Sequence, residues 1–448
     1  MKRTTKKIIL LILLLLGFVI ISYYPRLTIV TGFSAKSVAS GIFFADRSQE
    51  SIEKGDNDFS LLPFSENQVN AAERTVRSSI IGLKDRKAIF MDGLGATLLP
   101  ENPTREGNKL IPKRNFIKPD LPFPFGDLPQ KDTIFAEIDQ VKLKTAIDHA
   151  FDTGEERIKG TRSVIVVYKD QIIGEKYADG FDHLTPILGW SMTKSITATI
   201  YGILQKKGMV NIEDKTGIEA WQNDSRSEIT YNDLLHMNSG LEWDEDYADI
   251  SDVTSMLYES EEMGKVQLEK PQIGKINESW NYSSGTSNLL AGFLLQKVFK
   301  DRQAYLDFWY AELIDKIGMH SALIETDFVG NFVGSSYAWA TTRDWAKFGL
   351  LYLHDGNWNG EQIFDPAWSE YVATPTNGSN GRYGAHFWLN AGGHFPDVPK
   401  DMYSANGFQG QTVAIIPSKD LVIVRMGLVE DPDFDFNEFL SDIINSIH

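Results

Sequence analysis

Two pairs of short apolar segments, one near residue 170 and one near residue 419, have the pattern of β-hairpins. Residues 163–168 (SVIVVY) and 171–177 (QIIGEKY) flank a two-residue polar turn. Residues 411–417 (QTVAIIP) and 421–426 (LVIVRM) flank a second short polar turn. Runs rich in β-branched residues on either side of a brief turn predict two antiparallel strands in each case. We therefore expect one hairpin near each end of the region that follows residue 130.

Segments with helical spacing accompany both hairpins. Residues 138–151 precede the first hairpin and residues 434–447 follow the second, each with apolar positions three and four apart. Because both ends of the region supply strands, we expect an antiparallel sheet formed by the two ends, with the sequence between them forming a mostly helical lobe. This is a mixed α/β (α+β) fold, and a cleft between its lobes is the expected place for a small-molecule site.

The sequence before residue 130 lacks this regular pattern, although a helix is predicted over residues 66–78. Seven prolines lie between residues 100 and 129. Proline lacks a backbone donor and fixes φ, so this stretch is predicted to be an extended connection over a neighbouring surface. We predict three parts: an N-terminal segment over 1–24, an extension and connection over 25–129, and the main domain over 130–448.

The first 24 residues have the pattern of a membrane-targeting segment. Four cations precede an uncharged apolar run over residues 8–21, and two tyrosines and a proline follow shortly after. As a helix, residues 8–24 would extend about 25 Å, close to the hydrocarbon thickness of about 30 Å. No A-x-A-like cleavage site follows. We expect a single uncleaved anchor in the cell membrane with an extracytoplasmic main domain; cleavage, giving a secreted or periplasmic protein, is the alternative.

Composition narrows the classes of partner and cofactor. Of 448 residues, 42% are hydrophobic and 23% charged, as in folded soluble domains. The net charge of -17 repels phosphate backbones, so no nucleic-acid partner is expected. The chain has no cysteine, which excludes disulfides, thiolate zinc sites and cysteine nucleophiles. Zinc-peptidase, P-loop and dinucleotide-binding motifs are also missing, so no metal or cofactor is expected.

The segment Gly189-Trp190-Ser191-Met192-Thr193-Lys194 carries the strongest chemical signal. Apolar positions with helical spacing follow it, so Ser191 is predicted at a helix N-terminus with Lys194 one turn later. Residues three apart share a helix face, which lets the amine contact the hydroxyl. A serine hydroxyl becomes a good nucleophile when a neighbouring group accepts its proton, and the helix N-terminus offers amide donors to an oxyanion.

A bare S-x-x-K match is weak evidence, because the chain contains a second one. Ser51 and Lys54 have the same spacing but lie in a polar, acidic stretch with no apolar helix face behind them. The usual interpretation of such a match is a surface helix cap. The apolar context favours Ser191 over Ser51 as a nucleophile.

Two further segments supply candidate partners. Tyr282 and Ser284 precede an apolar helical run, and a tyrosine there could relay protons. Residues 405–411 (ANGFQGQ) open the second hairpin; Gly407 lets the backbone approach a ligand, and the amide of Phe408 could stabilise an oxyanion. Taken singly, the first segment is more typical of a helix cap and the second of a tight turn.

Together, in this order and separation, the three segments resemble the penicillin-recognising serine hydrolases: class C β-lactamases, D,D-peptidases and related esterases. Residues 234–241 (LLHMNSGL) and 337–353 are also similar to segments of that family, with the phrasing nearest its 6-aminohexanoate-dimer hydrolase branch. The resemblance implies a β-lactamase/transpeptidase-like fold. It implies Ser191 as nucleophile, Lys194 as activating lysine, Tyr282 as proton shuttle, and the amides of Ser191 and Phe408 as the oxyanion hole.

The chain departs from the family pattern at two positions. Ser284 replaces the asparagine of Y-x-N, and Ala405-Asn406-Gly407 replaces K/H-T-G, which removes the cation that meets a substrate carboxylate. A charge-assisted hydrogen bond is worth about 1.5–3 kcal/mol. We therefore expect an ester or amide hydrolase, including linear amide oligomers among its substrates, that acts through an acyl-enzyme on Ser191. The alternatives are a penicillin-binding peptidase or β-lactamase, and a non-catalytic ligand sensor on the same scaffold.

Two questions of role stay open at this level. Ionising a tyrosine at pH 7 costs about 4 kcal/mol and neutralising a lysine about 4.6 kcal/mol, so either Tyr282 or Lys194 could be the base. The acidic stretch over residues 242–262 could attract a cationic substrate end, although a solvated loop is expected. His236 is expected to be structural.

Overall fold

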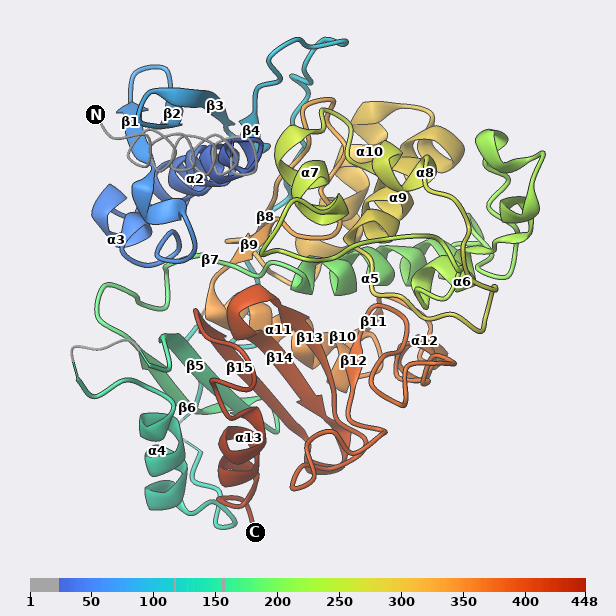
Figure 1. Ribbon diagram of the computed structural model, residues 1–448. Helices are drawn as coiled ribbons and strands as arrows, with labels where there is room; N and C mark the ends of the chain where they lie inside the picture. The colour runs from blue at the N-terminus through green and yellow to red at the C-terminus, as the bar shows by residue number, and fades with distance from the viewer. Residues whose placement is uncertain (1–23, 117, 127, 132, 155–157) are drawn as a thin grey trace, which may run out of the picture. The chain divides into compact units, whose positions relative to one another are not determined.

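A computed structural model describes residues 24–116, 118–126, 128–131, 133–154 and 158–448 (Figure 1). The described chain forms two compact units. The larger comprises residues 92–95, 107–243 and 262–448, and the smaller comprises residues up to 91 together with 96–106 and 244–261. The chain thus divides at other positions than the boundary predicted near residue 130.

The larger unit contains, in chain order, α4 (Gln140–His149), β5 (Thr161–Tyr168), β6 (Gln171–Tyr177), β7 (Ile187–Leu188), α5 (Met192–Lys206), α6 (Tyr231–Leu235), α8 (Gly264–Leu268), α9 (Ser284–Leu294), α10 (Arg302–Trp309), β8 (Leu323–Ile324), β9 (Ala338–Ala340), α11 (Thr342–Leu353), β10 (Asn357–Trp358), β11 (Glu361–Gln362), α12 (Ala367–Val372), β12 (Trp388–Leu389), β13 (Tyr403–Gly407), β14 (Gln411–Ile416), β15 (Leu421–Gly427) and α13 (Phe436–Ile444). Both predicted hairpins and both flanking helices are confirmed.

The main sheet joins the two ends of this unit, as predicted. Its strand order is β12-β13-β14-β15-β5-β6, and every neighbouring pair is antiparallel. The junction between the two hairpins pairs β15 with β5, for example Ile423 with Val166. Non-local pairing of this kind requires the whole intervening lobe to leave the sheet and return to it.

Both faces of the main sheet are covered, which explains its apolar central strands. In β5, Ile165 and Val167 belong to a core shared with α5 and α11, whereas Val164 and Val166 belong to a second core with α4 and α13. Figure 1 shows α4 and α13 on one face and α11 on the other. Consecutive β-branched residues in SVIVVY are therefore buried alternately on opposite faces.

The proline-rich stretch has no helix or strand between residues 99 and 139, within the part of it that the structure describes. From residue 107 it packs with the larger unit. Arg114 donates to the carboxylate of Asp315 (2.8 Å) and to the carbonyl oxygen of Ala322 (2.9 Å), and Phe123 is buried in the main core. The stretch is thus held on the larger unit by side-chain contacts, and it also contains a hydrogen-bonded turn in which the Leu128 amide donates to the Leu121 carbonyl oxygen (3.0 Å).

The smaller unit is an α/β layer built from α2 (Arg26–Phe43), α3 (Gln49–Glu53), β1 (Glu66–Asn70), β2 (Thr75–Ile80), β3 (Leu83–Met91), β4 (Gly95–Leu98) and α7 (Asp252–Glu259). Its strands form a sheet in the order β1-β2-β3-β4. The helix predicted over residues 66–78 is wrong. This segment is the antiparallel β1–β2 hairpin, in which Val69 pairs with Val76, because its exposed and buried residues alternate with a period of two.

The acidic stretch also differs from the loop expected for it. Residues 244–261 belong to the smaller unit and include α7, in which Val253, Met256 and Leu257 are buried. These apolar positions have helical spacing and outweigh the acidic composition around them.

The predicted anchor over residues 1–24 lies, except for residue 24, outside the described residues. In the part of the chain that is described, we find no helix with both the length and the apolar character to span a bilayer.

Two buried histidines, His386 and His236, form hydrogen bonds between segments of the helical lobe. His386 donates from Nδ1 to the carbonyl oxygen of Leu235 (2.6 Å) and its Nε2 lies 2.9 Å from Ser287 Oγ, while Ser195 donates to the His386 carbonyl (2.8 Å). One residue thereby links α5, the end of α6 and α9. His236 bonds to the Thr376 hydroxyl (2.6 Å), in keeping with the structural role expected for it.

Burial keeps both imidazoles neutral. It lowers the pKa of His386 to about 3, with the Lys194 charge acting in the same direction, and lowers the pKa of His236 to about 4. In the unfolded chain the pKa is about 6.5, so below that pH only the unfolded state gains these protons. The stability that the neutral imidazoles allow is therefore present above pH 6.5 and is lost as the pH falls toward 4.

We predict that His386→Gln reduces this pH dependence. Between pH 4 and pH 6.5, the slope of unfolding free energy against pH should fall by about 1.4 kcal/mol per pH unit, the contribution of one proton. Urea unfolding at several pH values measures the slope. His149→Gln, at an exposed position, is the matched control, and an equal change in both variants would contradict the assignment.

Candidate active site

Ser191 lies at the point where the chain turns from β7 into α5. It is the N-cap residue of the helix, and the preceding Trp190 has a φ of 48°, in the left-handed region that bulky residues rarely adopt. The apolar face of α5, including Ile196 and Ile200, is fully buried and holds the helix in the core. Ser191 therefore lies on a sharp turn whose position is fixed by the buried helix. The residue is 9% exposed.

The ammonium of Lys194 is the centre of the site. Its Nζ donates to Ser191 Oγ (2.8 Å), to Ser284 Oγ (2.9 Å) and to the carbonyl oxygen of Ser335 (3.1 Å). Lys194 is 1% exposed. A buried ammonium is costly unless acceptors replace its water, and these acceptors take that place. The two side chains of the S-x-x-K segment thus meet, and Ser284 joins them.

The aromatic ring of Tyr282 packs against the same Lys194 ammonium. Lys194 Nζ is 4.7 Å from the centre of the Tyr282 ring, which is half-buried. The ring makes an edge contact with Tyr383 (5.6 Å between centroids) and a tilted contact with Trp388 (5.3 Å). Ser283, between Tyr282 and Ser284, caps α9 by accepting from the Thr286 amide. The start of α9 therefore sets the positions of both predicted partners of Lys194.

Gly407 and Phe408 lie beside the turn that carries Ser191. The Cα of Gly407 packs so closely on the Gly189 carbonyl that no side chain fits there. The Phe408 ring contacts the Trp190 ring edge-on, with 5.5 Å between centroids. The Phe408 carbonyl is held by the side-chain amide of Gln411 (3.1 Å). This close approach explains the glycine and brings both predicted oxyanion-hole segments to one place.

The sequence interpretation missed Ser335. Its carbonyl accepts from Lys194, and its hydroxyl accepts from the side-chain amide of Asn288 on α9 (3.0 Å). Ser335 lies two residues before the segment that resembles the family, in a loop without a motif of its own. A backbone acceptor has no side-chain signature, so only the tertiary structure could identify it.

The second S-x-x-K match has none of this environment. Lys54 is exposed and pairs with Glu50 (2.6 Å) on the surface of α3, and Ser51 accepts a hydrogen bond from Arg47 (3.0 Å). Identical local spacing thus gives a solvated ion pair in one unit and a buried serine–lysine contact in the other.

Within the described ranges, no group of three or more His, Cys, Asp or Glu side chains is placed to hold a metal ion.

Comparison with solved structures supports the fold. A protein from Bacillus anthracis assigned as a 6-aminohexanoate-dimer hydrolase shares 21% identity at a TM-score of 0.54, covering 68% of this chain and 80% of its own. A family VIII carboxylesterase shares 13% identity (TM-score 0.53, 71% and 99% covered). A class C β-lactamase in complex with cefoxitin shares 12% (TM-score 0.51, 69% and 100% covered). Comparison with curated protein sequences gave no match.

The family is decided by a sequence model. The model described as Beta-lactamase matches residues 147–437, which is more than half of the chain and includes Ser191, Lys194, Tyr282 and Phe408. The predicted β-lactamase/transpeptidase-like fold and the resemblance to this family are both confirmed, and the chain belongs to the β-lactamase family of serine hydrolases.

Proposed function

We propose that this protein hydrolyses an ester or amide bond through an acyl-enzyme on Ser191. The observation that carries the proposal is the 2.8 Å contact between Lys194 Nζ and Ser191 Oγ, made at a helix N-terminus and shielded from solvent. Serine nucleophiles require a group that manages their proton at hydrogen-bond distance. The Lys194 amine meets this requirement without a histidine, and the centre of the Tyr282 ring lies 4.7 Å from the same nitrogen atom.

The proposed reaction has two steps. Ser191 Oγ attacks the carbonyl carbon as its proton passes to whichever of Lys194 and Tyr282 is deprotonated in the reacting state, as neutral amine or phenolate; the group that took the proton then gives it to the leaving oxygen or nitrogen as its bond to carbon breaks. A water molecule attacks the resulting ester, gives a proton to the same pair, and the acid leaves as Ser191 regains its proton. The amides of Ser191 and Phe408 donate to the carbonyl oxygen while negative charge develops on it.

The walls of the site favour an uncharged substrate. Rings of Trp190, Tyr282, Trp388 and Phe408 contact one another or the catalytic ammonium, which offers apolar surface to an acyl or leaving group. The Ala405-Asn406-Gly407 segment supplies no cation where relatives have K/H-T-G. A substrate carboxylate would therefore be desolvated without a charged partner.

Ser191→Ala should abolish steady hydrolysis of p-nitrophenyl esters, lowering kcat by at least about 10³-fold, because the nucleophile is removed. A fluorophosphonate should add its mass to one peptide containing Ser191, as measured by intact and peptide mass spectrometry. Ser51→Ala, which removes the other S-x-x-K serine, is the control and should keep both activity and label.

Other outcomes separate the alternatives. A single stoichiometric burst without turnover would favour the ligand sensor. Efficient turnover of a β-lactam or a D-alanyl peptide would favour the penicillin-binding alternative. A label on any residue other than Ser191 would overturn the site itself.

A matched pair of substrates tests the preference for neutral groups. The enzyme should hydrolyse p-nitrophenyl butyrate with a kcat/KM roughly ten- to a hundredfold above that of mono-p-nitrophenyl glutarate, because only the second carries a carboxylate that lacks a cationic partner. Equal kcat/KM values, or a preference for glutarate, would contradict this assignment. The rate measured with Ser191→Ala in parallel gives the background hydrolysis of each ester, which is subtracted.

We also propose that residues 1–24 anchor the protein in the cell membrane with the hydrolase outside the cytoplasm. Support comes from the sequence, in which cations precede an uncharged apolar run. The full chain should sediment with membranes and be digested by protease added to intact cells or spheroplasts. A variant with three apolar residues of the run replaced by aspartate should not reach the membrane fraction; recovery of the native chain in the soluble cytoplasm would contradict the proposal.

A further inference from the structure

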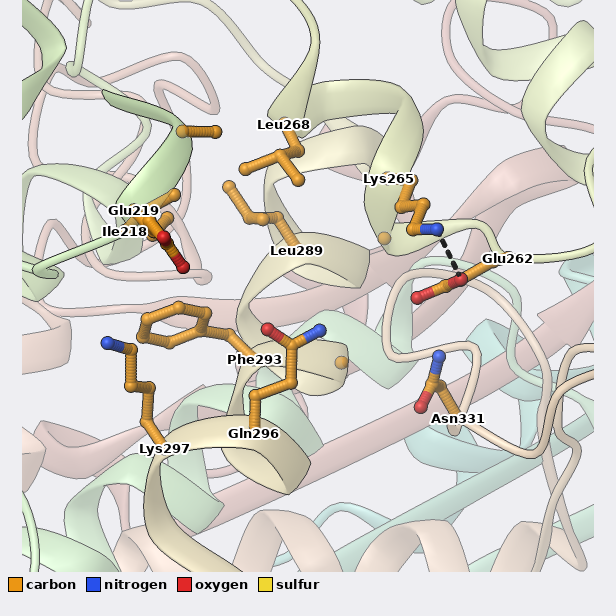
Figure 2. Close-up of a pocket in the computed structure, with 13 residues that line it drawn as sticks. Ile218, Glu219, Glu262, Lys265, Leu268, Leu289, Phe293, Gln296, Lys297 and Asn331 are labelled. Atoms are coloured by element: carbon orange, nitrogen blue, oxygen red, sulfur yellow. Dashed lines mark ion pairs between the residues drawn. The ribbon is translucent and has the colours of Figure 1, made fainter. Parts of the chain in front are cut away.

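A cavity lies in the larger unit, between α8, α9 and the π-helical turn Leu295–Phe299 that follows α9 (Figure 2). Its volume is about 480 Å³, within the range of small-molecule sites. Leu268, Leu289 and Phe293 form its apolar wall, as Figure 2 shows. π-Helical turns are rare in proteins, and those that occur are often found at functional sites. This turn contributes Gln296 and Lys297 to the cavity.

This cavity is separate from the Ser191 site. Ser284, which contacts Lys194, lies in the first turn of α9, whereas Phe293 lies near its end. Nine residues of α-helix extend about 14 Å. None of the residues that line the cavity belongs to the proposed catalytic machinery.

Gly292 indicates that the cavity is kept open. Glycine in a helix interior costs about 1 kcal/mol relative to alanine, so its presence requires a reason. At Gly264 the reason is packing, because an added Cβ would lie 2.8 Å from the Asn288 carbonyl oxygen. At Gly292 an added Cβ would meet only Asn331, at an ordinary 3.7 Å. Packing does not demand glycine there, and the missing side chain leaves room in the cavity that Gly292 lines.

Two opposite charges line the cavity without an ionic partner. Lys297 donates to the Gly217 carbonyl (2.9 Å) and lies 5.6 Å from the centre of the Phe293 ring. Glu219 is exposed on the neighbouring segment (Figure 2). Within the described part of the chain, neither has an oppositely charged group within 4 Å. Lys265, by contrast, is neutralised by Glu262 (3.1 Å).

We infer that this cavity binds a free α-amino acid with an apolar side chain. Its carboxylate would pair with Lys297, its ammonium with Glu219, and its side chain would lie on Leu268, Leu289 and Phe293. A simple carboxylate would satisfy Lys297 but be repelled by Glu219, and a simple amine would show the reverse. Only a ligand that carries both charges beside an apolar group complements all three features of the wall.

Calorimetric titration of the full-length protein with L-leucine and L-phenylalanine tests this inference. Each should bind at one site, and 4-methylpentanoate and 3-methylbutylamine, which each lack one charge of leucine, should bind roughly ten- to a hundredfold more weakly. Glu219→Gln and Lys297→Gln should each weaken binding at least about tenfold. Gly292→Leu should abolish it by filling the cavity.

Three controls keep the outcome decisive. Lys300→Gln removes an exposed lysine that does not line the cavity and should leave affinity unchanged. Ser191→Ala should also bind normally, which separates this site from the proposed hydrolytic one. If Gly292→Leu fails to fold, Glu219→Gln and Lys297→Gln still test whether the amino acid binds in this cavity. No heat of binding, equal affinity for leucine and its two single-charge analogues, or unchanged affinity in both charge variants would overturn the inference.

Discussion

The structure of this hydrolase site depends on the burial of one ammonium. Lys194 is removed from water, so its charge has to be met by acceptors from other parts of the fold. Ser191 comes from the same helix turn, Ser284 from the start of α9, and Ser335 from a loop 141 residues away from Lys194. If any of the three segments moved, the charge would lose an acceptor that no solvent replaces. The energetic cost of burying the lysine charge thereby holds Ser191 in place.

The surrounding architecture meets that demand by fixing three backbone segments rigidly. α5 is held by its buried apolar face, α9 by its serine cap and by the His386 contacts, and the Gly407 segment by its packing on Gly189. The Gly407 segment belongs to β13, in the main sheet that both ends of the larger unit close. The geometry of the candidate site is thus set by the core rather than by exposed surface loops.

The two S-x-x-K segments show how far local sequence carries the interpretation. Both place a lysine one turn after a serine, but Lys54 remains solvated beside Glu50, whereas Lys194 is enclosed. The apolar helix that follows Ser191 distinguished them in advance. The same logic failed for residues 66–78 and for the acidic stretch: a short polar segment pairs as a strand or folds as a helix according to the neighbours that cover it.

The sequence by itself determined the hairpins, the helices that flank them, the family and the candidate nucleophile, because β-branched runs, helical periodicity and catalytic motifs are local patterns. Only the tertiary structure decided that the Ser335 carbonyl accepts from Lys194, that Gly407 packs on Gly189, and that α7 belongs to the smaller unit. These features join residues far apart in the chain. A backbone acceptor, a close approach or an empty space beside Gly292 depends on what surrounds it, and no local pattern encodes those surroundings.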